Sequence, residues 1–156
     1  MSGGSARFTL DTNILVYSVD NAAGAKHRLA IEIVDRAAEC DCFLTLQALS
    51  EFYAAVTRKS IVPPPDAAAQ ASDWLEIFPC TAASASAVRT ALMDAAAGRA
   101  AYWDALLIAT AREAGCIVIL TEDLGDGTNL GGLAIHNPFA SRGQLSQTAR
   151  KVLGIT

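Results

Sequence analysis

The chain has 156 residues, of which 52% are hydrophobic and 18% are charged, and its formal net charge is −4. This size predicts one globular domain over residues 1–156 with its own hydrophobic core. No apolar stretch reaches the roughly 18 to 20 residues that cross a bilayer, and the first residues lack the apolar segment of a secretory signal. We therefore expect a cytoplasmic protein with no membrane-spanning segment.

Short apolar runs alternate with helical patterns along the chain. Residues 7–10, 42–44 and 116–120 are bounded by polar residues or glycine and predict buried parallel strands. Helices are predicted at 25–39, 46–57, from 66 toward 77, at 84–97 and at 102–114. Alternating strands and helices predict an α/β domain with a mostly parallel sheet and helices on both faces.

The last third of the chain is less regular. Residues 125–132 (GDGTNLGG) have the composition of a loop, residues 133–136 predict an edge strand, and Asn137-Pro138 predicts a turn. The chain contains no internal repeat and no linker that would divide the domain.

Two of four candidate acidic residues fall where such a sheet binds ligands, at the carboxyl ends of its strands. Asp11 directly follows the first strand, and Asp123 closely follows the strand at 116–120. Glu51 and Asp104 lie near the starts of two predicted helices. If those helix starts face the same edge, four carboxylates converge, and a hard divalent cation is the chemical reason to collect them.

Each acidic residue also has a simpler interpretation as a turn, a helix cap or a solvated surface group. Two positions argue against that interpretation. Asp104 lies within the otherwise apolar segment 101–108, and Glu51 lies between Leu49 and Phe52, where a charge without a partner is costly.

The charge and the cysteines limit the alternatives. Without the four acidic residues, the remaining chain has a net charge of zero rather than −4, so the acidic composition is compatible with a nucleic-acid substrate. The four cysteines form no CxxC pair, so we expect free thiols. A zinc site would need scattered ligands without the usual spacing.

Five short motifs resemble those of PIN-domain ribonucleases in order and approximate spacing, and the resemblance spans residues 8–139. Each motif is weak alone, but five in order are specific. They are FTLDTN (8–13), SEF (50–52), YWDALLIA (102–109), TEDL (121–124) and NPF (137–139).

The resemblance implies a small α/β/α sandwich that hydrolyses RNA with Mg²⁺ or Mn²⁺. The acidic positions of the family match Asp11, Glu51, Asp104 and Asp123, which are therefore the expected metal ligands and catalytic residues. Asn13 and Thr121 match polar positions that support the carboxylates through hydrogen bonds. Asp126 matches a position that is acidic in some relatives only, where it would contact the metal through a water.

Within the family, the short free-standing chain most resembles the VapC-type toxins of bacterial toxin-antitoxin pairs. That likeness implies a cognate antitoxin protein and a homodimer with the alanine-rich helices as its surface. It leaves open which RNA is cut, which basic residues contact it, and whether one ion or two are bound.

Two other functions remain as alternatives. A haloacid-dehalogenase-like phosphatase would need a second Asp two positions after Asp11, where this chain has Asn13. A non-catalytic RNA- or protein-binding module of the same fold would not need four clustered carboxylates, and it would bind RNA equally well in EDTA.

Overall fold

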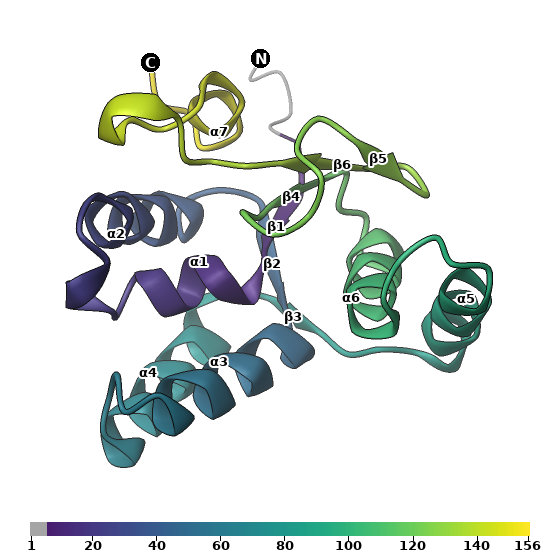
Figure 1. Ribbon diagram of the computed structural model, residues 1–156, viewed down its shortest axis with the longest axis horizontal. Helices are drawn as coiled ribbons and strands as arrows, with labels where there is room; N and C mark the ends of the chain where they lie inside the picture. The colour runs from purple at the N-terminus through teal and green to yellow at the C-terminus, as the bar shows by residue number, and fades with distance from the viewer. Residues whose placement is uncertain (1–5) are drawn as a thin grey trace.

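A six-stranded sheet in the order β3-β2-β1-β4-β6-β5 forms the centre of the computed structural model, which describes residues 6–156 (Figure 1). Only the β5–β6 pair is antiparallel among the strands described. The mostly parallel sheet confirms the predicted fold class. The strands are β1 (Phe8–Leu10), β2 (Cys42–Thr45), β3 (Cys80–Thr81), β4 (Val118–Leu120), β5 (Asn129–Leu130) and β6 (Leu133–His136).

Helices cover the sheet on both sides, with α1 and α2 on the left and α5 and α6 on the right in Figure 1. None of the helices in residues 6–156 combines the length and apolarity needed to cross a membrane. The α-helices are α1 (Thr12–Tyr17), α2 (Ala25–Ala37), α3 (Leu46–Arg58), α4 (Pro64–Ile77), α5 (Ala85–Ala96), α6 (Tyr102–Glu113) and α7 (Gln147–Val152), with 3-10 turns at Asn21–Ala23 and Ser141–Gly143.

The two central strands are buried on both faces, which explains why their sequences are continuous apolar runs rather than alternating patterns. Every residue of β1 and β4 is buried. Phe52 of α3 is fully buried, and its ring packs in an edge-to-face arrangement with Trp74 of α4, with 4.8 Å between the ring centroids. The core therefore continues from the sheet into α3 and α4.

Several short elements were not predicted from the sequence. Helix α1 begins one residue after β1 and has only six residues, so it is too short for helical periodicity to be visible. Strands β3 and β5 have two residues each, and α7 has six. Helix α4 begins at Pro64, two residues before the predicted Asp66, because proline suits the first turn of a helix.

Arg7 connects three parts of the fold just before β1. Its guanidinium donates to the Ala114 carbonyl at 2.7 Å, pairs with Asp41 at 3.1 Å and lies 4.6 Å from the centre of the Phe43 ring. Gly115 makes this approach possible, because its φ is +90° and a Cβ there would lie 3.1 Å from Nη1 of Arg7. The turn that leads from α6 toward β4 thus depends on glycine.

We expect Gly115→Ala to destabilise the fold more than Gly98→Ala. Both glycines have positive φ, so each substitution should cost about 1 kcal/mol of backbone strain. Gly98 has nothing within 4 Å of a built Cβ, whereas Gly115 meets Arg7, whose displacement should add about 1 kcal/mol from one lost hydrogen bond. Urea unfolding measures the difference. Equal losses in the two variants would show that the Arg7 contact does not stabilise the fold.

Candidate active site

Asp11 and Asp123 lie at the carboxyl edge of the sheet because their strands are neighbours. β1 and β4 pair in parallel with Leu10 opposite Leu120, and the Asp11 amide donates to the Leu120 carbonyl at 3.0 Å. Asp11 follows β1 directly and Asp123 is the third residue after β4. The strand register alone therefore brings these two carboxylates to one place.

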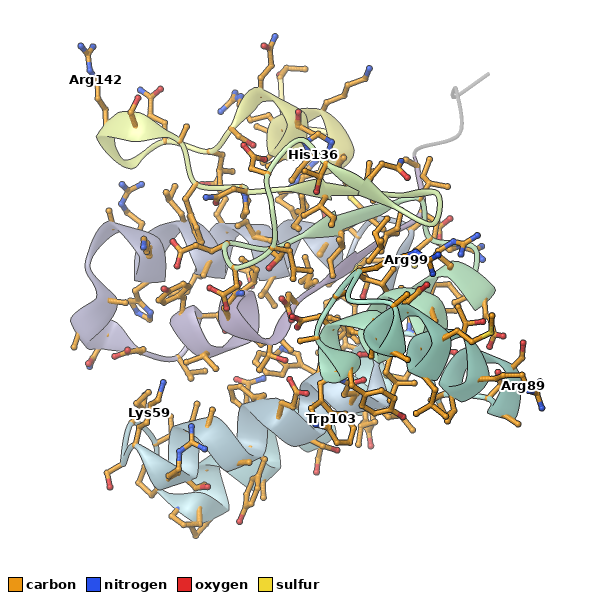
Figure 2. The ribbon with its side chains drawn as sticks, turned by 45° about the vertical axis from the view of Figure 1, so that its right-hand side comes forward. Lys59, Arg89, Arg99, Trp103, His136 and Arg142 are labelled. Atoms are coloured by element: carbon orange, nitrogen blue, oxygen red, sulfur yellow. The ribbon has the colours of Figure 1, made fainter. Side chains whose placement is uncertain are left out.

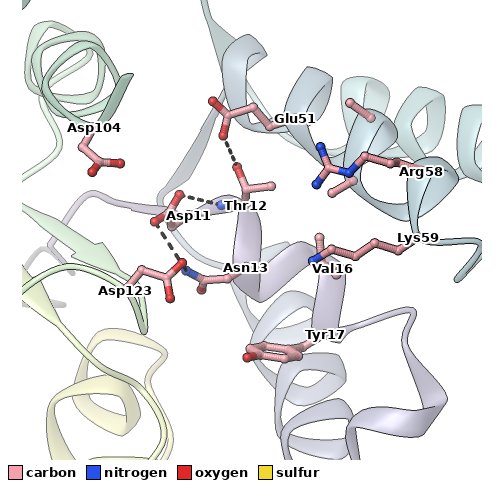
Figure 3. Close-up of a pocket in the computed structure, with 12 residues that line it drawn as sticks. Asp11, Thr12, Asn13, Val16, Tyr17, Glu51, Arg58, Lys59, Asp104 and Asp123 are labelled. Carbon is pink, nitrogen blue, oxygen red and sulfur yellow. Dashed lines mark hydrogen bonds between the residues drawn. The ribbon is translucent and has the colours of Figure 1, made fainter. Parts of the chain in front are cut away.

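Glu51 and Asp104 reach the same place from helices. Glu51 is in the second turn of α3, which begins directly after β2, and Asp104 is in the first turn of α6. All four acidic side chains line one pocket of about 550 Å³ (Figure 3). The structure thus brings together all four of the acidic residues that the sequence analysis selected.

Asp11 is 8% exposed, yet both of its oxygens have donors. The Thr121 hydroxyl donates to Oδ2 at 2.7 Å, and the Thr12 amide donates to Oδ1 at 2.7 Å, so Asp11 also caps α1. Burial raises the pKa of Asp11, the nearby charges of Asp104 and Asp123 raise it further, and the two hydrogen bonds oppose them. The residue is at once a helix cap and a member of a carboxylate cluster.

Asn13 joins α1 to the loop after β4. Its Nδ2 lies 3.0 Å from an oxygen of Asp123 and 3.2 Å from the Thr121 hydroxyl, and its Oδ1 accepts weakly from the Glu122 amide at 3.4 Å. The Thr121 hydroxyl also accepts from the Asp123 amide at 3.2 Å. Asn13 and Thr121 therefore both contact the carboxylates at the ends of β1 and β4, through Asp123 and Asp11 respectively.

Glu51 has two donors that the sequence analysis did not identify. The Thr12 hydroxyl donates to Oε2 at 3.0 Å, and Gln47 Nε2 donates to Oε1 at 2.9 Å. Gln47 Nε2 also lies 2.9 Å from the Trp103 carbonyl, which ties α3 to the start of α6. The contact between Gln47 and Glu51 could have been predicted, because residues four positions apart on a helix are neighbours on its surface.

Asp104 differs from the other three pocket carboxylates in its contacts. It is half-buried, and its side chain has no hydrogen-bond partner in residues 6–156. Burial raises its pKa, and the charges of Glu51 and Asp123 raise it further. Ionising the cluster at neutral pH therefore costs free energy, which a bound cation would offset.

The donor set fits a hard divalent cation by its chemistry, since it consists of carboxylate oxygens and adjacent hydroxyls. As the side chains stand, no three His, Cys, Asp or Glu residues among those described are close enough together to hold one ion. Rotation of side chains would have to complete the site. Asp104 is best placed to do so because no hydrogen bond restrains it within the described chain.

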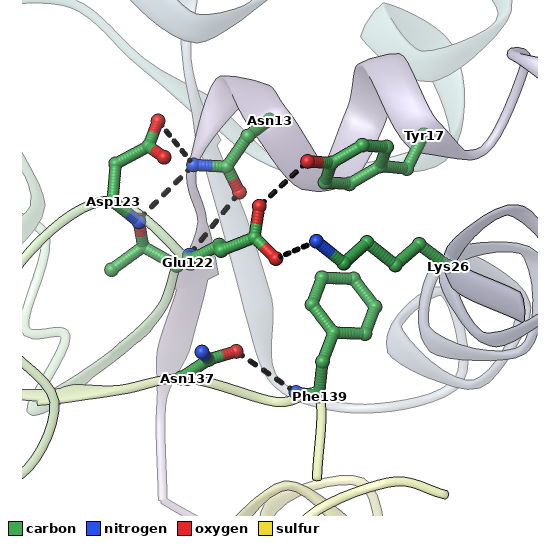
Figure 4. Close-up of polar contacts among 8 residues, drawn as sticks. Asn13, Tyr17, Lys26, Glu122, Asp123, Asn137 and Phe139 are labelled. Carbon is green, nitrogen blue, oxygen red and sulfur yellow. Dashed lines mark hydrogen bonds and ion pairs between the residues drawn. The ribbon is translucent and has the colours of Figure 1, made fainter. Parts of the chain in front are cut away.

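A second polar network holds the loop that carries Asp123 (Figure 4). Glu122 accepts from the Tyr17 hydroxyl at 2.6 Å and pairs with Lys26 of α2. Burial opposes ionisation of Glu122, but the hydrogen bonds from Lys26 and Tyr17 outweigh it and lower its pKa. This network could not be predicted from sequence patterns, because Glu122 is about a hundred residues from Tyr17 and Lys26 along the chain.

Asp126 does not line the pocket. Its Oδ1 accepts from the Asn137 amide at 2.8 Å, and the residue is exposed. The structure therefore places Asp126 in a turn beside β6 and separates it from the other acidic residues that the sequence analysis considered.

A family model described as PIN domain matches residues 8–125. The sequence has no match among curated proteins.

Several solved structures have similar folds, among them VapC20 and two VapBC complexes. VapC20 from Mycobacterium tuberculosis, described as a sarcin-ricin loop cleaving toxin, is 18% identical with a TM-score of 0.60, over 74% of this chain and 89% of its own. VapBC2 from Rickettsia felis, bound to a promoter DNA fragment, is 15% identical with a TM-score of 0.58, over 84% and 98%. DNA-bound VapBC from Salmonella typhimurium is 16% identical with a TM-score of 0.56, over 85% and 98%.

The PIN domain match covers well over half of the sequence and includes all four pocket carboxylates. The chain belongs to the PIN domain family.

Proposed function

We propose that this chain is a metal-dependent endoribonuclease that hydrolyses RNA phosphodiester bonds with Mg²⁺ or Mn²⁺, acting as one nuclease domain over residues 1–156. The observation that carries the proposal is that Asp11, Glu51, Asp104 and Asp123 line a single pocket at the carboxyl edge of the sheet. Membership of the PIN domain family supports nuclease chemistry at this pocket.

The four carboxylates would hold the ion, with Asp11 and Asp123 reaching it from the sheet and Glu51 and Asp104 from the helices. When bound, the ion would make water a better nucleophile and offset charge on the phosphate. The chain's own contribution is orientation, because Thr121 fixes one oxygen of Asp11 while Asn13 contacts Asp123.

The alternatives are less consistent with the contacts. A dehalogenase-like phosphatase needs an acid two residues after its nucleophile, whereas Asn13 presents an amide whose hydrogens face Asp123 and Thr121. In a non-catalytic binding module, the raised pKa values of Asp11 and Asp104 would reflect a cost in stability with no benefit.

We further propose that the ribonuclease is a growth-inhibiting toxin that a small cognate antitoxin neutralises in the cytoplasm. Support comes from the solved structures with similar folds, since one is of a toxin and two are of VapBC complexes. The four cysteines are unpaired, which suits a reducing compartment. A homodimer is also proposed, since Leu92 and Met93 of the alanine-rich α5 are 54% and 64% exposed, and sedimentation velocity tests it.

Cleavage should require a divalent cation. The purified protein should cut RNA in Mg²⁺ or Mn²⁺ and lose activity in excess EDTA. Asp104→Asn should lower kcat by about 100-fold or more, because loss of even a supporting group commonly costs 10- to 100-fold. Asp66→Asn is the matched control, since Asp66 is in the first turn of α4 and outside the pocket. Undiminished cleavage in EDTA would refute the metal mechanism.

Expression of the protein should slow bacterial growth. Asp11→Asn should restore growth, as should co-expression of the small protein encoded beside it, while Asp66→Asn should remain toxic. Growth curves under an inducible promoter measure this. Equal growth of cells that express wild type and Asp11→Asn would exclude the toxin role and leave the nuclease proposal standing.

A further inference from the structure

Two basic side chains share the pocket with the carboxylates. Arg58, the last residue of α3, and Lys59, which follows it, both line the pocket and are exposed. Figure 3 shows them extending from the end of α3 into the side of the pocket opposite Asp104 and Asp123. No other lysine or arginine of residues 6–156 lines it.

The charges of Arg58 and Lys59 are not neutralised within the described part of the chain, where neither side chain has an ion pair or a hydrogen bond. Lys26 of α2, by contrast, forms an ion pair with Glu122. Other basic residues that do have acidic partners are Arg7, Arg36 and Arg99. The two cations at the pocket are therefore available to an external anion.

The pocket extends along α3, with the carboxylates at one end and the two cations at the other. Glu51 and Arg58 are seven residues apart on α3, so they lie on one face about 10 Å apart along the axis. Between them the pocket is lined by Ala54 and Ala55, whose side chains end at Cβ, and Val16 of α1 also lines it. This leaves a trough that leads from the carboxylates to the cations.

We propose that Arg58 and Lys59 bind backbone phosphates of the RNA next to the bond that is cut, and so position the strand along α3. The inference rests on the proposed ribonuclease function. A polyanion in a pocket with four carboxylates needs cationic contacts beyond the metal, and phosphate contacts fix the register of a nucleic acid without reading its sequence.

A purely structural role is the simpler explanation of these residues, because basic side chains at the end of a helix stabilise its dipole. Salt dependence separates the two roles. Each phosphate contact to a single strand contributes about 0.7 to the slope of log affinity against log salt concentration, so removing two contacts should reduce the slope by about 1.4. Loss of a helix-end charge changes stability without changing this slope.

The test compares Arg58→Gln/Lys59→Gln with the control Arg142→Gln/Lys151→Gln, which removes two exposed cations outside the pocket, and Figure 2 shows where Arg142 lies. Cleavage of a fluorescein-labelled single-stranded RNA is followed at fixed Mg²⁺ and increasing KCl. We expect Arg58→Gln/Lys59→Gln to raise KM about tenfold and to change kcat little. The slope of log KM against log KCl concentration should be smaller by about 1.4 than in wild type. The control should match wild type, and Arg58→Lys, which keeps the charge, should retain the slope.

The outcomes distinguish this inference from the function on which it rests. If wild type cleaves RNA and the pocket variant has an unchanged KM or an unchanged slope, the phosphate contacts are refuted and the ribonuclease stands. The same holds if the variant keeps RNA cleavage intact but loses binding to the purified antitoxin, which would assign the cations to an acidic protein partner. If wild type does not cleave RNA at all, the proposed function itself fails.

Discussion

The hydrogen bond from Thr121 to Asp11 is the interaction on which the candidate site depends. It joins the ends of β1 and β4 and gives a carboxylate that is 8% exposed a donor in place of water. The same hydroxyl accepts from the Asp123 amide and lies within reach of Asn13. Thr121, which is fully buried, thus connects the end of β1, the start of α1 and the loop that carries Asp123.

Collecting four acidic groups has a cost that explains much of the surrounding structure. The pKa values of Asp11 and Asp104 are raised, first by burial and then by neighbouring carboxylates. A raised pKa means that the two groups destabilise the metal-free fold once both are ionised, and that this cost is relieved as the pH falls through the raised values. Donors such as Gln47 and Thr12 hold Glu51 against the repulsion.

The sequence predicted the features that rest on continuous patterns and missed those that rest on distant contacts. Buried apolar runs located β1, β2 and β4, and from their parallel pairing the meeting of Asp11 and Asp123 follows. Periodicity could not reveal the six-residue α1. The four-residue spacing of Gln47 and Glu51 on one helix could have indicated their contact. The pairing of Lys26 with Glu122 could not be predicted, because it joins α2 to the loop after β4 and depends on the tertiary fold.

Calorimetry of wild type, Asp104→Asn and Asp66→Asn, with and without Mg²⁺, tests most directly whether Asp104 and the other pocket carboxylates hold a metal ion. If Asp104 belongs to a cluster of carboxylates that repel one another, Asp104→Asn should be more stable than wild type in EDTA. The gain should be about 1 kcal/mol for a well-solvated pair of charges, and it should appear as a higher melting temperature. The variant should also lose most of the stabilisation that Mg²⁺ gives wild type. Asp66, at a comparable helix start, should show neither effect. A lower melting temperature for Asp104→Asn in EDTA, with an unchanged Mg²⁺ shift, would show that Asp104 only stabilises the start of α6.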